Sequence, residues 1–308
     1  MTQISTTLKF DRAIQQMGVT QDRLSKTQMQ LSTTKQVLKP SDAPDKSAEI
    51  SRLKSAVDRQ NSYIDTMKQV QDKLSQQESA LDAATDIMSR LKELTVQAAN
   101  DTYQAKDRKS IDIEVRELRD QLLSLANSQD VNGNYLFSGT RVGQLAFAAN
   151  EQGRVVYQGD QTIVPAGIGD QSMVDTNRAG TRPFDKIVRT DAQGNPVAVG
   201  FFEAIQDLST ALQANDTKGI SRAVGEMTTM QDGLSDSLAA IGAAGNKVEN
   251  QLNVADENLL RMKEVLSNAE DVDYTEAITK MNKDMLALEA AQSSFAKISQ
   301  LNLFDYIK

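Results

Sequence analysis

Residues 132–140 have the sequence NGNYLFSGT, and they mark the end of a long helix-permissive stretch. The preceding residues 45–132 contain neither glycine nor proline. Asparagine and glycine favour turns and tolerate left-handed backbone, so NGN predicts a helix end and the start of a differently built region. The residues expected to join the two regions are Gly133, Tyr135, Leu136, Phe137 and Gly139.

The turn-forming residues are concentrated in the middle of the chain. Ten of the 16 glycines and three of the five prolines lie between residues 133 and 200, and residues 246–308 again have neither. The segments YLFSG (135–139), RVVYQG (154–159) and QTIVPAG (161–167) are predicted to be strands between glycine turns. The fold expected is therefore mainly α, with a β-rich insertion at 137–200 and long helices from both termini.

Both ends of the chain carry an apolar stripe at coiled-coil spacing. In the first helix, Ala13 and threonines lie three positions after most members of a seven-residue repeat, which is the 3,4 alternation of a two-helix seam. The N-terminal stripe comprises Phe10, Met17, Leu24, Leu31 and Leu38. The C-terminal stripe comprises Ile278, Met281, Met285, Leu288, Phe295 and Ile298. These residues are predicted to form a seam through which subunits assemble.

Capped breaks separate these stripes from the rest of the chain. Pro40 disfavours helix at the residue before it, Asp42 is expected to cap the next helix, and Pro44 suits its first turn. Asp273 is the expected N-cap of the last helix, with Glu276 at capping-box spacing. We therefore expect an inner domain (1–40 with 272–308), a helical rod (41–136 with 201–271) and a β-rich outer domain (137–200).

Composition excludes several classes of function. The 308 residues include no cysteine and no histidine, so disulfides, thiolate metal sites and histidine catalysis are all closed. The net charge of −8 argues against a nucleic-acid partner. No apolar run reaches the ~18 residues of a membrane span, and the N-terminal MTQISTTLKF does not resemble a cleaved secretory signal.

Two local patterns resemble ligand sites. Gly167 and Gly169 begin a dinucleotide-binding fingerprint, but Ser172 replaces its third glycine. The acidic cluster of Glu270, Asp271, Asp273 and Glu276 has no calcium-loop spacing, so helix capping is the better interpretation. We therefore predict no cofactor, no metal and no catalytic residue.

Four segments resemble the flagellin family, and within it the hook-associated members. They are LSTTKQVLKPSDAPDKSAEISRLKSAVDRQNSYIDTM (31–67), LANSQDVNGNYLFSGT (125–140), VDYTEAITKM (272–281) and AKISQLNLFDYIK (296–308). The family usually has glycine where Thr34 stands and SDDP where this chain has Ser41-Asp42-Ala43-Pro44, which weakens the local match at that turn. The Lys39-Pro40 pair and the GNYLFSGT segment favour a junction protein over a filament subunit.

The resemblance implies a structural subunit of the bacterial flagellum that polymerises between hook and filament. Its implied partners are further copies in a ring or tube, another hook-associated protein on the hook side, flagellin on the filament side and a cytoplasmic export chaperone. It also implies an extracellular location, reached through the flagellar type III apparatus without a cleaved signal peptide.

A different class of function also fits the pattern of stripes and insertion. A secreted binding protein could present the β-rich domain on a helical stalk and recognise a carbohydrate or surface ligand. Such a stalk should be a stable free dimer or trimer, whereas a junction subunit should be a monomer whose ends become ordered on assembly. An enzyme would need a convergent cluster of carboxylates in residues 137–200, which the spacing does not reveal.

Overall fold

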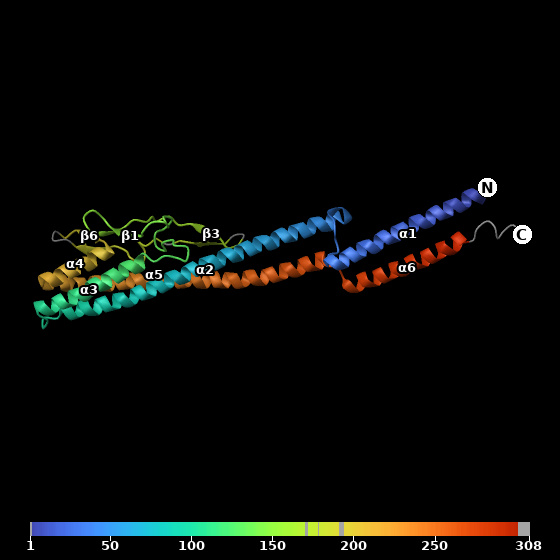
Figure 1. Cartoon of the computed structure of the whole chain (residues 1–308). Coiled ribbons are helices and arrows are strands. Elements are labelled where there is room, and N and C mark those ends of the chain that lie inside the picture. The colour runs from blue at the N-terminus through green and yellow to red at the C-terminus, as the bar shows by residue number, and fades with distance from the viewer. Residues whose placement is uncertain (1, 170–171, 178, 191–193, 301–308) are drawn as a thin grey trace. The chain divides into compact units, whose positions relative to one another are not determined.

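The computed structural model describes residues 2–169, 172–177, 179–190 and 194–300 (Figure 1). It confirms a mainly α fold whose long terminal helices pack together and whose middle holds a small β insertion. The helical elements are α1 (Thr2–Thr33), the 3-10 turn η1 (Pro40–Asp42), α2 (Pro44–Ala99), α3 (Ala105–Ala126), α4 (Phe201–Ala214), α5 (Thr217–Glu270) and α6 (Tyr274–Gln300). Across the described part of the chain, no helix combines the length and apolar character needed to cross a membrane.

The chain divides into two compact units. One, here called the terminal unit, contains residues 1–59 and 258–308; the other, the central unit, contains residues 60–257. The long helices α2 and α5 each contribute one end to the terminal unit. The three-part division expected from the sequence stays a prediction.

In the terminal unit, α1 and α6 lie side by side and run in opposite directions (Figure 1). The α1 helix ends at Thr33, before the last residue of the apolar stripe. Thr34 then adopts a positive φ of 60°, a conformation that β-branched residues rarely take. The chain therefore turns here on a threonine, at a backbone conformation that favours glycine.

In the central unit, α2, α3, α4 and α5 all contribute buried apolar residues. Met88 and Leu91 of α2, Val115 of α3, Ile205 of α4 and Leu234 of α5 are almost completely buried. The break between α2 and α3 falls at residues 100–104, which have the sequence NDTYQ.

The β insertion consists of three separate antiparallel hairpins among the described residues. The pairs are β1 (Phe147–Ala149) with β2 (Val155–Tyr157), β3 (Pro165–Gly167) with β4 (Met173–Asp175), and β5 (Ile187–Thr190) with β6 (Pro196–Val199). The strands predicted at RVVYQG and QTIVPAG are present in shortened form. The strand predicted for residues 135–139 is wrong, because that backbone forms only isolated bridges, Gln129 with Tyr135 and Ser138 with Ala179.

An aromatic cluster and an ionic contact hold the insertion against the helices of the central unit. The cluster comprises Phe137, Phe147, Tyr157, Phe184, Phe201 and Phe202, whose contacting rings have centroids between 5.2 and 5.9 Å apart. On β5, Arg189 donates to Asp207 of α4 at 2.6 Å and to Glu226 of α5 at 2.7 Å. Hydrogen bonding to Glu226 raises the pKa of Arg189 against its partial burial, so the guanidinium stays charged.

Candidate functional site: the terminal helix pair and the junction turn

The first candidate site is the seam between α1 and α6. Phe10 packs edge-on against Phe295, with ring centroids 5.4 Å apart. Near the other end of the pair, Lys35 and Asp271 form an antiparallel bridge. These two contacts define an antiparallel register that places Leu24 of α1 level with Met281 of α6.

The residues predicted in this seam differ in their burial. Leu24 is buried, at 7% exposure, whereas Phe10, Met17, Leu31, Met281, Leu288 and Phe295 are only half-buried. Leu38 is half-buried but lies in the connector after α1 rather than in the helix. Ile298 belongs to α6, and its side chain lies outside the described residues.

At two positions of α6, the residue that faces α1 is the one just before the residue predicted to lie in the seam. Ile278 and Met285 are 45% and 41% exposed, while Ala277 and Asp284 just before them are buried. Ala277 and Asp284 alternate with Met281 and Leu288 at spacings of four and three, which is the geometry of a two-helix seam. Within the single chain, small and polar residues therefore occupy these two places facing α1, and the role of Ile278 and Met285 in subunit assembly stays a prediction.

The two connectors of the terminal unit, residues 34–43 and 271–273, are hydrogen-bonded to each other. The Gln36 amide donates to the Glu270 carbonyl at 2.8 Å, and the Val272 amide donates to the Thr34 carbonyl at 2.9 Å. Because each connector satisfies backbone groups of the other, the entry to α6 and the exit from α1 are held as one joint, here called the connector clasp.

The predicted caps occupy both connectors. Asp273 accepts hydrogen bonds from the amides of Thr275 and Glu276, at 2.8 and 3.1 Å, which is N-cap geometry for α6. Pro40 begins η1 and Pro44 begins α2. Asp42 differs from expectation: it lies in η1 and forms an ion pair with Lys26 of α1 at 3.1 Å. The 3-10 turn moves its carboxylate toward α1 and away from the start of α2.

Glu270 provides the charged centre of the connector clasp. Its carboxylate lies 2.5 Å from the Lys35 ammonium and 2.7 Å from the Lys54 ammonium of α2. Burial would raise the pKa of Glu270, but hydrogen bonds from Lys35 and Lys54 and their charges lower it overall. The hydrogen bond with Glu270 in turn raises the pKa of Lys35. The acidic cluster of the sequence therefore consists of an ion-pair centre and a helix cap.

The second candidate site is the junction turn at residues 132–140. The Asp130 carboxylate accepts from the amides of Asn132 and Asn134, and Gly133 adopts a φ of +80°. Leu136 and Phe137 are buried and Tyr135 is half-buried. The Leu136 carbonyl accepts a hydrogen bond from the buried Gln77 of α2 at 3.0 Å. The turn is therefore tied by both apolar and polar contacts to the helical core of the central unit.

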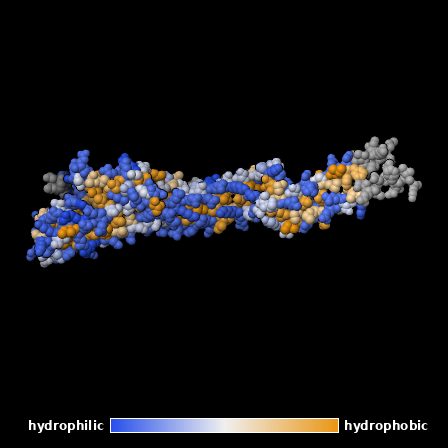
Figure 2. Space-filling view, in the orientation of Figure 1, coloured by the Kyte–Doolittle hydropathy of each residue, from blue (hydrophilic) through white to orange (hydrophobic). Residues whose placement is uncertain are grey.

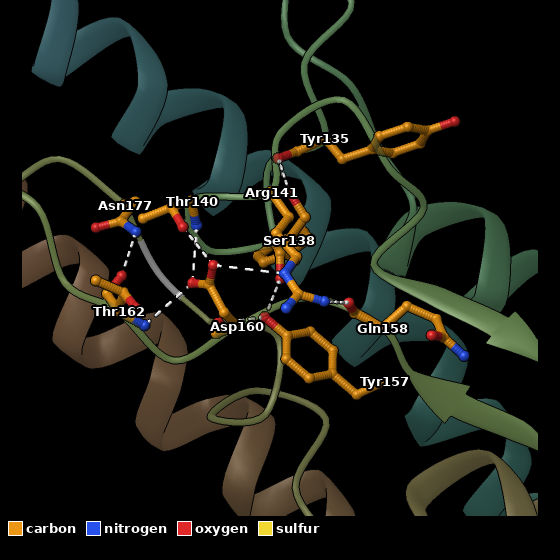
Figure 3. A network of polar contacts seen from close by, with 10 residues as sticks. Tyr135, Ser138, Thr140, Arg141, Tyr157, Gln158, Asp160, Thr162 and Asn177 are labelled. Carbon is orange, nitrogen blue, oxygen red and sulfur yellow. Dashed lines mark hydrogen bonds and ion pairs between the residues drawn. The ribbon is translucent and has the colours of Figure 1, made fainter.

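A network of polar contacts fixes the insertion beside this turn (Figure 3). The Asp160 carboxylate accepts hydrogen bonds from the amides of Thr140 and Thr162, at 3.0 and 3.1 Å, and from the Thr140 hydroxyl. These bonds from Thr140 lower the pKa of Asp160. The Tyr157 hydroxyl lies within hydrogen-bond distance of the carbonyls of Phe137 and Asp160. Gly139, at φ +72°, has no room for a side chain because a Cβ would collide with the Asp160 carbonyl.

The chemistry of these two sites is that of packing and hydrogen bonding. Within the described residues, no three acidic side chains converge in an arrangement that could hold a metal ion. Sequence reasoning missed Asp284, Glu270 as an ion-pair centre, Asp160 and Arg189. A buried polar residue at heptad spacing could have identified Asp284, but the partners of the other three come from distant parts of the chain.

Comparison with known proteins identifies the family. Residues 4–142 match the bacterial flagellin N-terminal helical region, and residues 223–307 match the bacterial flagellin C-terminal helical region. "Flagellar hook-associated protein 3" of Escherichia coli is 28% identical over 245 residues, covering 75% of this chain and 76% of that protein.

Solved structures agree at the level of the fold. A putative flagellar hook-associated protein from Vibrio parahaemolyticus superposes with a TM-score of 0.65 at 21% identity, covering 75% of this chain and all of that one. The flagellar junction protein FlgL from Legionella pneumophila superposes with a TM-score of 0.58 at 18% identity, covering 66% and 99%. With matches to both helical regions that flank the insertion, the chain belongs to the flagellin family.

Proposed function

We propose that this chain is a structural subunit of the bacterial flagellum that forms the junction between hook and filament by polymerising through its terminal helices. As a flagellin-family protein it is structural and not an enzyme. Its similarity to hook-associated protein 3 supports the position at the hook, and the fold it shares with a flagellar junction protein agrees. The subunit then works outside the cell, after export through the flagellar type III apparatus.

The observation that carries this proposal is the incomplete burial of the terminal helix pair. Along α1 and α6, many large apolar side chains are more than two-fifths exposed, namely Leu8, Ile14, Val19, Met29, Tyr274, Ile278, Met285 and Leu286. On the face drawn in Figure 2, hydrophobic residues interrupt the polar surface of the terminal unit. Apolar area left in contact with water at ~25 cal/mol per Å² favours packing against further copies.

One flank of the seam is especially suited to another helix. Ile278 and Met285 are seven residues apart and project from the same side of α6, next to the buried positions of the seam. By the antiparallel register, the exposed Ile14 of α1 borders the same flank. A third helix from a neighbouring copy would cover all three residues and extend the two-helix seam into a wall of a tube.

The partners follow from this arrangement and from the family. Copies of the chain form a ring or tube through the stripe predicted in both terminal helices. Another hook-associated protein contacts the ring on the hook side, flagellin contacts it on the filament side, and a cytoplasmic chaperone holds the subunit before export. In this assignment residues 1–40 with 272–308 form the inner domain, 41–136 with 201–271 the rod, and 137–200 the outer domain.

Deletion of the gene in the source bacterium tests the proposal. We expect electron microscopy to show hooks without filaments, with flagellin lost to the medium, and a plasmid copy to restore filaments. Filaments of normal length in the deletion strain would contradict the junction role. Purification of the free chain as a stable dimer or trimer, together with intact filaments, would favour the stalk-type binding protein instead.

A further inference from the structure

The seam of the terminal helix pair contains a buried carboxylate oxygen without a partner. Asp284 is 8% exposed, and its Oδ2 atom is buried with no hydrogen-bond donor in reach among the described residues. A buried charged oxygen normally has a donor, because its desolvation is otherwise uncompensated. Asp284 therefore indicates a contact that the single chain does not make.

The facing helix does not supply the missing donor. The register of the pair places the buried Thr20 and Thr27 of α1 along the same seam. Thr20 donates its hydroxyl proton to the Gln16 carbonyl at 2.9 Å, and Thr27 donates to the Arg23 carbonyl at 3.0 Å. Both protons are therefore used within α1, and neither hydroxyl can satisfy Asp284 without losing its own bond.

Asp284 lines a hollow along one flank of the seam, opposite to the flank that carries Ile278 and Met285. The hollow is bordered by Arg23 of α1 and by Glu276, Thr279, Lys280 and Lys283 of α6. Arg23 directs its guanidinium to the Thr20 hydroxyl at 3.4 Å. Lys280 precedes Asp284 by four residues, and this order of charges is the less favourable one for a helical ion pair. The hollow thus has cations at its rim and an unmatched acceptor in its wall.

We propose that Asp284 is an assembly contact, which accepts a hydrogen bond from a lysine or arginine of a second copy of this chain. This inference rests on the proposed polymerisation through the terminal helices. Charge complementarity points to α1 of the second copy, since residues 1–39 contain six Lys or Arg and two Asp or Glu. Arg12 is one residue that could supply this donor, because it is exposed on α1, away from the seam, and makes no ion pair in the described part of the chain.

The unmatched carboxylate also gives the free subunit a specific property. Until a second copy arrives, Asp284 weakens the α1–α6 pair, and once the donor is in place it favours one register. Removing the charge should therefore have opposite effects on the free subunit and on the assembly. An ion pair within one chain, with Arg23 or Lys280, would instead make the same change harmful to both.

Two substitutions and a control test this prediction in the full-length chain. In the purified free subunit, we expect Asp284→Asn and Asp284→Leu to slow amide exchange in α1 and α6 by about tenfold or more. Glu289→Gln, which removes an exposed charge from the same helix, should leave exchange unchanged. Faster exchange in Asp284→Asn would show that Asp284 is paired within its own chain and would overturn the proposal.

The assembly side is measured in the deletion strain carrying plasmid copies. We expect Asp284→Leu to lower the number of attached filaments at least severalfold, with wild type and Glu289→Gln both restoring them. Full restoration by Asp284→Leu would overturn this inference alone, whereas failure of the wild type to restore filaments would count against the proposed function.

Cross-linking identifies the occupant of the hollow. A photo-reactive residue in place of Lys280, at the rim, should give cross-linked products at multiples of the mass of this chain in isolated flagella. Cross-links only to proteins of other sequence would overturn the assignment to a second copy. The same residue in the free subunit at low concentration is the control and should yield no dimer.

Discussion

The terminal unit and the central unit are built from helices with the same apolar spacing, yet they bury their apolar residues to different depths. In the central unit Met88, Leu91 and Phe137 are completely buried. In the α1–α6 pair, Leu24 and Ala277 are the buried apolar residues among the side chains described. A heptad stripe therefore specifies which face of a helix is apolar, and the number of elements that cover that face decides whether it becomes a core.

The two units should therefore contribute differently to folding of the free subunit and to its assembly. The central unit has four helices and an insertion around one core, so its residues should determine how well the free subunit is folded. The terminal pair has only two helices and a buried acceptor without a partner, so its residues should determine assembly. Four sets of substitutions test this separation, in order from the largest expected effect on the free subunit or its assembly to the smallest.

Truncation of a core aromatic residue should have the largest effect on folding. Phe137 is 0% exposed and its ring packs against Phe184. We expect Phe137→Ala to lower the free energy of unfolding by about 3–5 kcal/mol, because it leaves a cavity among rings that cannot close around it. Urea denaturation of the free subunit measures this. The matched change Phe10→Ala, in the half-buried terminal pair, should cost about 1 kcal/mol or less; equal losses would break the comparison.

A charge in the terminal seam should affect assembly more than folding. Leu24 is 7% exposed, and Leu24→Asp would place an unpaired charge between α1 and α6 at a local cost of several kcal/mol. We expect a nearly unchanged thermal transition, which reports the central unit, and loss of motility. Gln28→Asp adds the same charge at an exposed position of α1 and should remain motile. A motile Leu24→Asp strain would refute the seam, and loss of the thermal transition would show that α1 belongs to the main core.

Two glycines of the junction turn should differ in their tolerance of a side chain. Gly133 and Gly139 both have positive φ, but only at Gly139 would a Cβ meet the Asp160 carbonyl. We expect Gly133→Ala to cost about 1 kcal/mol and Gly139→Ala about 2–3 kcal/mol in thermal unfolding of the free subunit. A milder effect at Gly139 than at Gly133 would mean that the Asp160 network does not constrain the turn.

The connector clasp should depend weakly on pH. Because the pKa of Glu270 is lower in the folded chain, its ion pairs stabilise fully above the unfolded value of about 4.3 and are lost as pH falls through the folded value. We expect Glu270→Gln to speed amide exchange at residues 35, 36 and 272 severalfold at pH 7. The difference in amide-exchange rate between wild type and Glu270→Gln should become smaller below about pH 4. Glu264→Gln, at an exposed position of α5, should show no such difference at any pH.

Local signals in the sequence were enough to identify the architecture. The distribution of glycine and proline separates helical arms from the insertion, because these residues act on the backbone within a few positions of themselves. Heptad spacing identified the helices that became α1 and α6, and the segments around Lys39-Pro40 and NGNYLFSGT identified the family. Asp273 lies at the start of α6 for the same reason, since a helix cap is a contact between neighbours in sequence.

Contacts between distant residues were decided only by the tertiary structure. Lys54 and Glu270 are 216 positions apart, and nothing in either segment predicts that the two connectors meet. The segment YLFSG has strand-like composition, yet its backbone lies against Ser128, Val142 and Gly180 and forms no regular strand. The hydrophobicity of Ile278 and Met285 predicted that these two residues face α1. In the structure, Ala277 and Asp284 are buried against α1 instead. A sequence pattern specifies which side of a helix prefers to be covered, and the depth of burial depends on how much of the rest of the chain is there to cover it.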